Sequence, residues 1–361
     1  MRRALAALAG WVLLVSASPP PNVDDALIAG EALSPSLKAF NLLFGPYGRM
    51  PNARVTPYNL NTPLFSDYAE KFRFLYVPAG RKIGWRDDGV LDFPVGSVLI
   101  KSFGYPADMR RPDAGLRILE TRLLIRRASG WIALPYVWNE AQTEARLSPI
   151  GADILVSFTD EDGAAVAFDW AVPNRNQCKG CHDRAGDLEP IGPSARNLNR
   201  VHFMFGPDRH HAETMLVNQL FDWGRIGILS GAPSQSQAPQ VPEAYEASTG
   251  SLDTRARAYL DVNCAHCHNP EGPAHTSGLD LRWSQHEPVQ WGVLKRPVAA
   301  GRGSAGYDFA IEPGHPERSI LLYRMESTDP GVMMPELGRQ RVDARGVALI
   351  RQWIAEMDAQ P

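Results

Sequence analysis

Alternating apolar and polar positions predict β-strands over much of the first half of the chain. In the stretch Ser97–Phe103, Leu99 and Lys101 share one face, and Val98 and Ile100 share the other. Gly, Asp or Pro residues bound each predicted strand. The other strands are Lys71–Val77, Leu116–Arg126, Trp131–Trp138, Asp153–Phe158 and Ala164–Val172. Short strands at this spacing are typical of an antiparallel β-sandwich or barrel.

A helical period of apolar positions appears later in the chain. Ser251 can cap a helix over Leu252–Val262, and Asp343 can cap a last helix that turns Ile350 and Trp353 inward. Two further helices are predicted over Ala212–Trp223 and Ser319–Met325. Residues 230–250 are rich in Pro, Ser, Gln and Ala and are typical of a linker.

The composition is that of an ordinary globular protein, with 44% hydrophobic and 21% charged residues among 361. This length is enough for two or three domains. The formal net charge of −3 gives no support for nucleic-acid binding.

The N-terminus has the pattern of a secretory signal peptide. Met1-Arg2-Arg3 is followed by an apolar run from Ala4 to Val15 and by small residues around Ala17. The run is too short to span a bilayer, and no later stretch is long or apolar enough to do so. We therefore expect a signal peptide over residues 1–17, a mature chain without a membrane span, and a periplasmic location.

Two copies of the pattern C-x-x-C-H contain all four cysteines of the chain: Cys178, Cys181 and His182, then Cys264, Cys267 and His268. In c-type haem attachment, each cysteine forms a thioether to the porphyrin and the adjacent histidine binds the iron. Tetrahedral zinc would need a fourth ligand for each motif, and disulfide exchange would not need the histidine. The sequence therefore predicts two covalently bound haem c groups, with His182 and His268 as iron ligands.

A methionine in a Pro- and Gly-rich loop can bind the second haem iron on its other side. Met334, directly before Pro335, is the predicted ligand, with Met333 as the alternative. Such His/Met ligation raises the reduction potential and favours electron transfer over substrate binding at that iron.

The corresponding position at the first haem stays open in the sequence. Its candidates are His202, Met204, His210, His211 and Met215, or no protein ligand at all. Arg175 and Arg196 are candidates to pair with a haem propionate, because arginine suits carboxylates. His266, inside the second motif, is expected at the surface.

These elements predict an α+β multidomain fold. An N-terminal antiparallel β-sandwich or barrel-like domain is followed by a haem-bearing connecting region and a C-terminal all-α, class I-like cytochrome c domain. The expected boundaries are 1–17 for the signal peptide, 18–55 for an N-terminal extension, 56–172 for the β-rich domain, 173–229 for the first haem-binding region, 230–250 for the linker and 251–361 for the cytochrome domain.

On four stretches the chain resembles a family of largely uncharacterised, exported bacterial dihaem c-type cytochromes. These stretches are Leu60–Tyr68, Pro173–His182, Pro190–Asn199 and Arg257–Pro270. The part after residue 250 is also similar to the cytochrome c domains fused to some quinoprotein dehydrogenases. There a Met-Pro-x-Leu-Gly loop supplies the axial methionine, which implies Met334 in this chain.

The leading hypothesis is a periplasmic dihaem cytochrome that transfers single electrons between redox proteins, such as a dehydrogenase, another cytochrome or a terminal reductase. It is expected to be a carrier more than a catalyst, with no catalytic residues of its own. The alternative is a haem enzyme, peroxidase-like or oxidising a small molecule, with an open first haem that the second one supplies with electrons. In a third hypothesis the β-domain is a docking module for a dehydrogenase.

Overall fold

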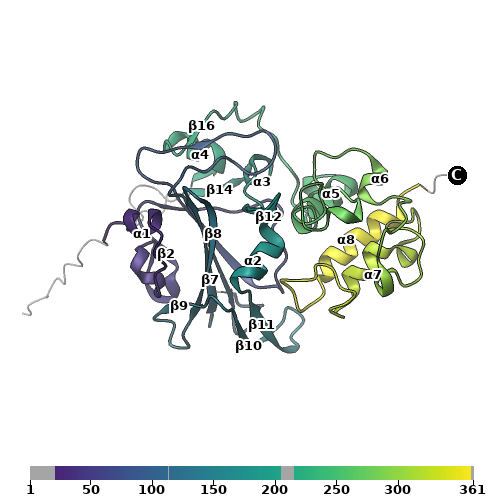
Figure 1. The fold of residues 1–361 in the computed structure, drawn as a ribbon, viewed down its shortest axis with the longest axis horizontal. Helices are drawn as coiled ribbons and strands as arrows, with labels where there is room; N and C mark the ends of the chain where they lie inside the picture. Colours follow the sequence, from purple (N-terminus) through teal and green to yellow (C-terminus); the bar gives the residue numbers. More distant parts are fainter. Residues whose placement is uncertain (1–20, 113, 205–214, 359–361) are drawn as a thin grey trace, which may run out of the picture.

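The computed structural model describes residues 21–112, 114–204 and 215–358. The chain forms a larger part built around a β-sheet and a smaller part that starts near Ser251. Figure 1 shows helix α2 (Arg175–His182) lying between the sheet and the C-terminal helices. The predicted signal peptide, residues 1–17, lies outside the described residues. Strands make up 26% of the described residues and helices 24%.

The larger part contains one antiparallel sheet of six strands in the order β3-β4-β6-β7-β8-β9. Their bounds are Val55–Pro57, Glu70–Tyr76, Val98–Tyr105, Arg117–Arg127, Gly130–Trp138 and Ala145–Leu147. The two edge strands, β3 and β9, have only three residues each, so few backbone hydrogen bonds form at either edge of the sheet. The alternation predicted for Ser97–Phe103 is confirmed, because Ile100 and Leu99 belong to different hydrophobic cores.

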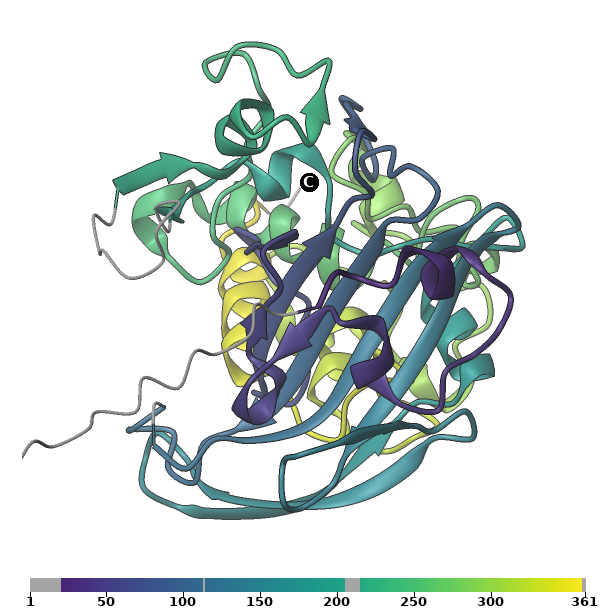
Figure 2. The same cartoon turned by 90° about the vertical axis from the view of Figure 1, so that its left-hand side faces the viewer.

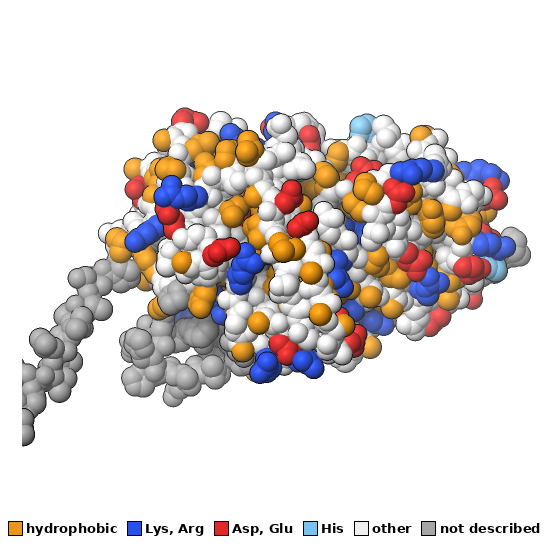
Figure 3. Space-filling view, turned by 90° about the horizontal axis from the view of Figure 1, so that it is seen from below, with side chains coloured by type: hydrophobic (Ala, Val, Ile, Leu, Met, Phe, Trp, Pro, Cys, Tyr) orange, Lys and Arg blue, Asp and Glu red, His pale blue; other side chains and the backbone are white. Residues whose placement is uncertain are grey.

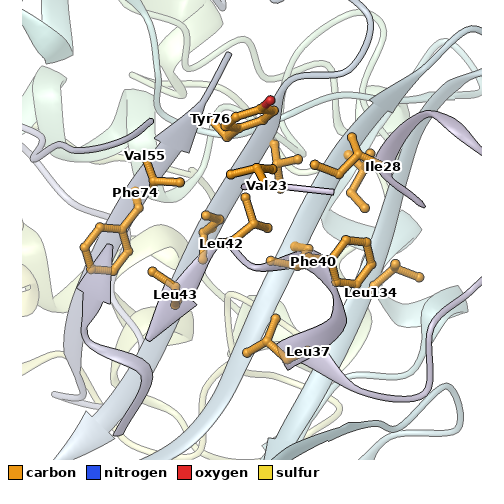
Figure 4. Close-up of a cluster of buried hydrophobic side chains, with 14 of the residues drawn as sticks. Val23, Ile28, Leu37, Phe40, Leu42, Leu43, Val55, Phe74, Tyr76 and Leu134 are labelled. Atoms are coloured by element: carbon orange, nitrogen blue, oxygen red, sulfur yellow. The ribbon is translucent and has the colours of Figure 1, made fainter. Parts of the chain in front are cut away.

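The N-terminal segment covers one face of this sheet, as Figure 2 shows. It contains α1 (Asp25–Ala29), a 3₁₀ turn at Leu37–Phe40, and the strand pair β1 (Leu43–Phe44) and β2 (Met50–Pro51). Ile28 and Phe40 pack there against Leu134 of the sheet (Figure 4). Residues 18–55, predicted as an extension, therefore include much of a hydrophobic core.

The opposite face carries two short helices, α3 (Ala195–Leu198) and α4 (Gln219–Arg225). Their side chains Leu198, Leu220 and Trp223 form a second core with Leu75 and Leu99 of the sheet. Strand β16 (Leu229–Ser230) also pairs in parallel with β5 (Ile83–Gly84). The region predicted as a separate connecting segment is thus packed onto the sheet.

The predicted sandwich or barrel is wrong. Strands β10 (Ala152–Thr159) and β11 (Ala165–Val172) pair only with each other within the described residues, and the remaining sheets are two-stranded pairs. Those pairs are β12 (Asp183–Arg184) with β13 (Asp187–Leu188), β14 (Val201–Met204) with β15 (Met215–Asn218), β1 with β2, and β5 with β16. The alternating pattern correctly located the strands, but it contains no information about partners beyond the next turn.

The prediction of a C-terminal all-α cytochrome domain is also wrong. The helices after residue 250 are α5 (Leu252–Asn263), α6 (Pro288–Trp291), α7 (Ile320–Glu326) and α8 (Ala344–Ala355). Long irregular connections separate them, with parallel bridges from Val293 to Ile311 and from Phe309 to Ser319. Proline and glycine recur between α5 and α7, so these segments cannot continue a helix.

Individual helices in this part were predicted more accurately than the domain as a whole. The Ser251 hydroxyl accepts a hydrogen bond from the Thr254 amide at 3.2 Å, and Asp343 accepts one from Gly346 at 2.9 Å. Both predicted caps are therefore confirmed. The helix predicted over 212–223 is wrong at its start, since Met215 begins strand β15 and α4 starts at Gln219.

Candidate cofactor site

Each C-x-x-C-H motif is held by its own local structure. The first forms the last five residues of α2. The start of this helix is fixed by a reciprocal pair: the Asn174 side chain accepts from the Gln177 amide and the Gln177 side chain accepts from the Asn174 amide, both at 2.9 Å. The second follows the end of α5, where the Cys264 amide donates to the Leu260 carbonyl at 2.9 Å. All four cysteines are free thiols.

The two motifs touch each other. The Cys267 sulfur lies 3.7 Å from the carbonyl oxygen of Gly180, inside the first motif. Just beyond the motifs, the Arg184 guanidinium pairs with Glu271 at 2.6 Å, and the Ala185 amide donates to the Glu271 carbonyl at 3.0 Å. Segments more than eighty residues apart in the sequence are thus joined at this point.

Both motifs line a single cavity of about 910 Å³ between the sheet and the C-terminal part. Cofactor and ligand sites in proteins have volumes of roughly 300–1,000 Å³, so this cavity is at the upper end of that range. Its wall on the sheet side includes Leu99, Lys101 and Arg122, and its wall on the C-terminal side includes Tyr259 and Met334. All six motif residues predicted to hold haem reach this cavity.

The two motif histidines are oriented as metal ligands require. The Nδ1 of His182 lies 2.7 Å from the Glu189 carbonyl oxygen, which can only accept, so Nδ1 carries the proton. His268 Nδ1 lies 3.0 Å from the Ser277 hydroxyl oxygen, and that hydroxyl donates in turn to the Ala274 carbonyl at 2.7 Å. Both arrangements leave the Nε2 lone pair for a metal.

The histidines and the cysteines are both uncharged at neutral pH. Burial lowers the pKa of His182 and of His268 to about 4, so both imidazoles are in the form that binds iron. Burial also raises the pKa of Cys264 and of Cys267 to about 12, which disfavours the thiolates that zinc would require. The described residues contain no group of three or more His, Cys, Asp or Glu side chains arranged for a metal ion. The residues present fit haem c better than zinc.

The predicted methionine loop reaches the same cavity. Met333 and Met334 both line it, Met333 being only 8% exposed. The loop is anchored through its backbone: the Met334 amide donates to the Arg324 carbonyl at 2.9 Å, and Arg324 Nε donates to the Val332 carbonyl at 2.8 Å. The structure thus keeps both methionines as candidate ligands.

Arg339 is a residue of this loop that sequence reasoning missed. It is 4% exposed, and its guanidinium donates to the carbonyls of Met334, Arg324, Met325, Ser327 and Arg341 at 2.7–3.3 Å. A single buried cation therefore ties the methionine loop to the end of α7. No sequence pattern distinguishes it from a surface arginine.

The candidates for the open ligand position at the first haem lie in different places, and the structure describes only some of them. His202 is absent from the cavity lining. Met204 and Met215 are opposite each other in the β14–β15 hairpin. His210 and His211 lie outside the described residues. The expectation for His266 is wrong, because it is half-buried and lines the cavity next to the two motifs.

Neither predicted propionate partner is found in the cavity lining. Arg196 is 7% exposed and pairs with Asp88 at 2.6 Å and with Asp261 at 3.0 Å, so it links the two parts of the molecule instead. Arg175 is exposed at the start of α2. The cationic side chains that do face the cavity from the sheet are Lys101 and Arg122.

These two cations differ in their partners. Arg122 donates twice to the buried Glu120 carboxylate, at 2.8 and 2.5 Å, and Trp170 donates to the same carboxylate at 2.8 Å. The Lys101 ammonium lies 4.7 Å from the centre of the Phe103 ring and has no carboxylate partner in the described structure. Burial, together with nearby Arg73 and Lys71, holds the pKa of Lys101 well below its usual range.

A further missed feature is the strap Leu60–Tyr68, which connects both parts of the molecule beside the cavity. The Phe65 amide donates to the Asn263 side chain at 2.7 Å, directly before the second motif. Asp67 accepts from the amides of Gln340 and Arg341, both at 2.8 Å. The strap thus fixes the position of the second motif and of the segment after the methionine loop.

Comparisons with protein-family models, with curated proteins and with solved structures give no match. None of the helices in the described part of the chain is long and apolar enough to cross a membrane. Lys, Arg, Asp and Glu side chains are interspersed on the face shown in Figure 3, without one dominant sign of charge.

Proposed function

We propose that this chain is an exported dihaem c-type electron-transfer protein, with one haem at each C-x-x-C-H motif. The observation that carries the proposal is that both motifs line one cavity and touch at Cys267 and Gly180. The first haem would be attached at Cys178 and Cys181, and the second haem at Cys264 and Cys267.

Different residues of the chain would attach the haems, bind their irons and orient the iron ligands. The four cysteines anchor the two groups covalently, and His182 and His268 offer Nε2 to the irons. Glu189 and Ser277 keep these imidazoles in the required tautomer and orientation. Met334 offers its thioether to the second iron. Bound haem c supplies one-electron chemistry, its iron alternating between the ferric and ferrous states.

The shared cavity favours electron transfer between the two motifs. The strap and the methionine loop, each held by hydrogen bonds, would limit movement of the ligands. The partners of the protein would be redox proteins that donate electrons to the haem at one motif and accept electrons from the haem at the other. The basic start Arg2-Arg3, the apolar run and the small residues at the N-terminus support an exported location, where haem attachment takes place.

Intact-mass measurement tests the proposal directly. The chain is produced in a bacterial host with haem-attachment machinery and compared with two double variants, C178A/C181A and C264A/C267A. We expect two covalent haems on the wild-type chain and one on each variant. A mature chain without added haem would refute the proposed function.

A further inference from the structure

The position of His266 in the cavity calls for an explanation. It is the residue before Cys267 in the second motif, a position that C-x-x-C-H attachment leaves free to vary. Its Nδ1 lies 3.3 Å from the Val262 carbonyl oxygen, which accepts the ring proton. Its Nε2 has no hydrogen-bond partner in the described structure, although the ring is half-buried and lines the cavity.

His266 thus has the same features as the two motif histidines. All three rings bond through Nδ1 to an oxygen of the chain and leave Nε2 without a protein partner. Because the Nδ1 proton of His266 is donated to the Val262 carbonyl, the Nε2 lone pair is available to bind a metal.

The contact between the motifs brings His266 close to the first haem. Its neighbour Cys267 lies against Gly180, which is two residues before His182. His268, on the other side of Cys267, belongs to the second haem, for which Met333 and Met334 are available on the same loop. At the first motif, in contrast, His202 is the sequence candidate whose side chain the structure describes, and it is absent from the cavity lining.

We propose that His266 is the second axial ligand of the first haem iron, opposite His182. This inference rests on the proposed function. The first haem would then have two imidazole ligands, and the second one imidazole and one thioether. A ligand of the first iron would lie two residues from a ligand of the second, so one short segment would connect both irons.

Lys101 is the competing ligand on the sheet wall, because an uncharged amine can also bind iron. Three variants separate the possibilities: H266A, K101M and the control H275A. His275 is a histidine of the same region whose Nδ1 also bonds to a carbonyl, that of Gly272 at 3.0 Å, but it is absent from the cavity lining.

The experiment uses the full chain with its haems attached. Near-infrared magnetic circular dichroism of the oxidised protein distinguishes bis-imidazole from imidazole–methionine iron, and carbon monoxide binding to the reduced protein reveals an open iron. We expect one haem of each type in the wild type, with no carbon monoxide bound. H266A should lose the bis-imidazole band and gain one carbon monoxide site, whereas K101M and H275A should not.

The outcomes distinguish the two proposals. A wild type with two haems but no bis-imidazole band, or one whose first haem already binds carbon monoxide, overturns the assignment of His266 and keeps the proposed function. An open iron in K101M in place of H266A assigns the ligand to Lys101. Absence of both haems refutes the proposed function itself. The wild-type spectrum decides the matter even if H266A does not fold.

Discussion

The two C-x-x-C-H motifs have the same sequence pattern but lie in different structural surroundings. The first belongs to a helix packed on a β-sheet, with Lys101 and Arg122 in the wall it faces. The second lies among irregular segments, and a methionine loop pinned by Arg324 and Arg339 faces the same cavity. Under the proposed function, the attachment pattern would specify the cofactor, while the properties of each haem would depend on residues far away in the sequence.

This difference has a functional consequence under the proposed ligands. Methionine as an axial ligand raises the reduction potential relative to histidine. The second haem would then have the higher potential, and an electron entering at the first haem would move toward the second.

The largest effect is expected for Arg339→Ala. The substitution removes the donor to five backbone carbonyls at a buried position, and buried acceptors without partners are costly. We expect the free energy of unfolding to fall by roughly 3 kcal/mol, measured by urea denaturation. Arg302→Ala is the control, because that arginine is exposed and pairs with exposed Asp329. An equal loss in both variants would show that the loop is not held by Arg339.

Met334→Ala tests the asymmetry of ligands. We expect the potential of the second haem to fall by on the order of 0.1 V, within the roughly 0.8 V range that axial ligands span. A redox titration followed by absorption measures it, together with the loss of the methionine-to-iron charge-transfer band. Met333→Ala is the matched control. If only the Met333 variant loses the band, the assignment moves to that residue.

On the sheet side, Lys71 should make the stability of the protein depend on pH. Burial lowers the pKa of Lys71 from 10.5 to about 7, and its ammonium donates to the Leu64 carbonyl at 2.7 Å. Between about pH 7 and 10.5 the unfolded chain therefore binds this proton more readily than the folded one. The free energy of unfolding contributed by this group should rise with pH in that window, by at most about 1.4 kcal/mol per pH unit.

Denaturant unfolding of the wild type and of Lys71→Met at pH 7, 8 and 9 measures this contribution. The difference between the two proteins should change with pH in favour of the wild type. A difference that is constant over this range would contradict the lowered pKa.

The smallest effect is expected at the ion pair between the segments that follow the motifs. Arg184 and Glu271 are both partly exposed, and such pairs contribute about 0–1 kcal/mol. Arg184→Met should lower the free energy of unfolding by about 0.5 kcal/mol and leave the haem content unchanged by intact mass. Loss of a haem in this variant would mean that the surface pair, rather than the packed strap and loop, holds the motifs together.

Local features of the sequence predicted local features of the structure well. The caps Ser251 and Asp343 and the alternation around Ile100 each involve only a few neighbouring residues, whereas the shared cavity of the two motifs was not predicted. The intrinsic strand propensity of a segment does not identify the strand it pairs with. The sequence therefore did not predict that β10 pairs with β11, nor that Met215 begins a strand. His266, Arg339 and Asp67 are functional or structural only through burial, which arises when distant segments meet.

Electron paramagnetic resonance of the fully oxidised protein tests most directly whether two haems share the one cavity. Two ferric haems in contact have interacting spins. We therefore predict that the wild-type spectrum differs from the sum of the spectra of C178A/C181A and C264A/C267A, each with a single haem. A wild-type spectrum equal to that sum would contradict a shared cavity.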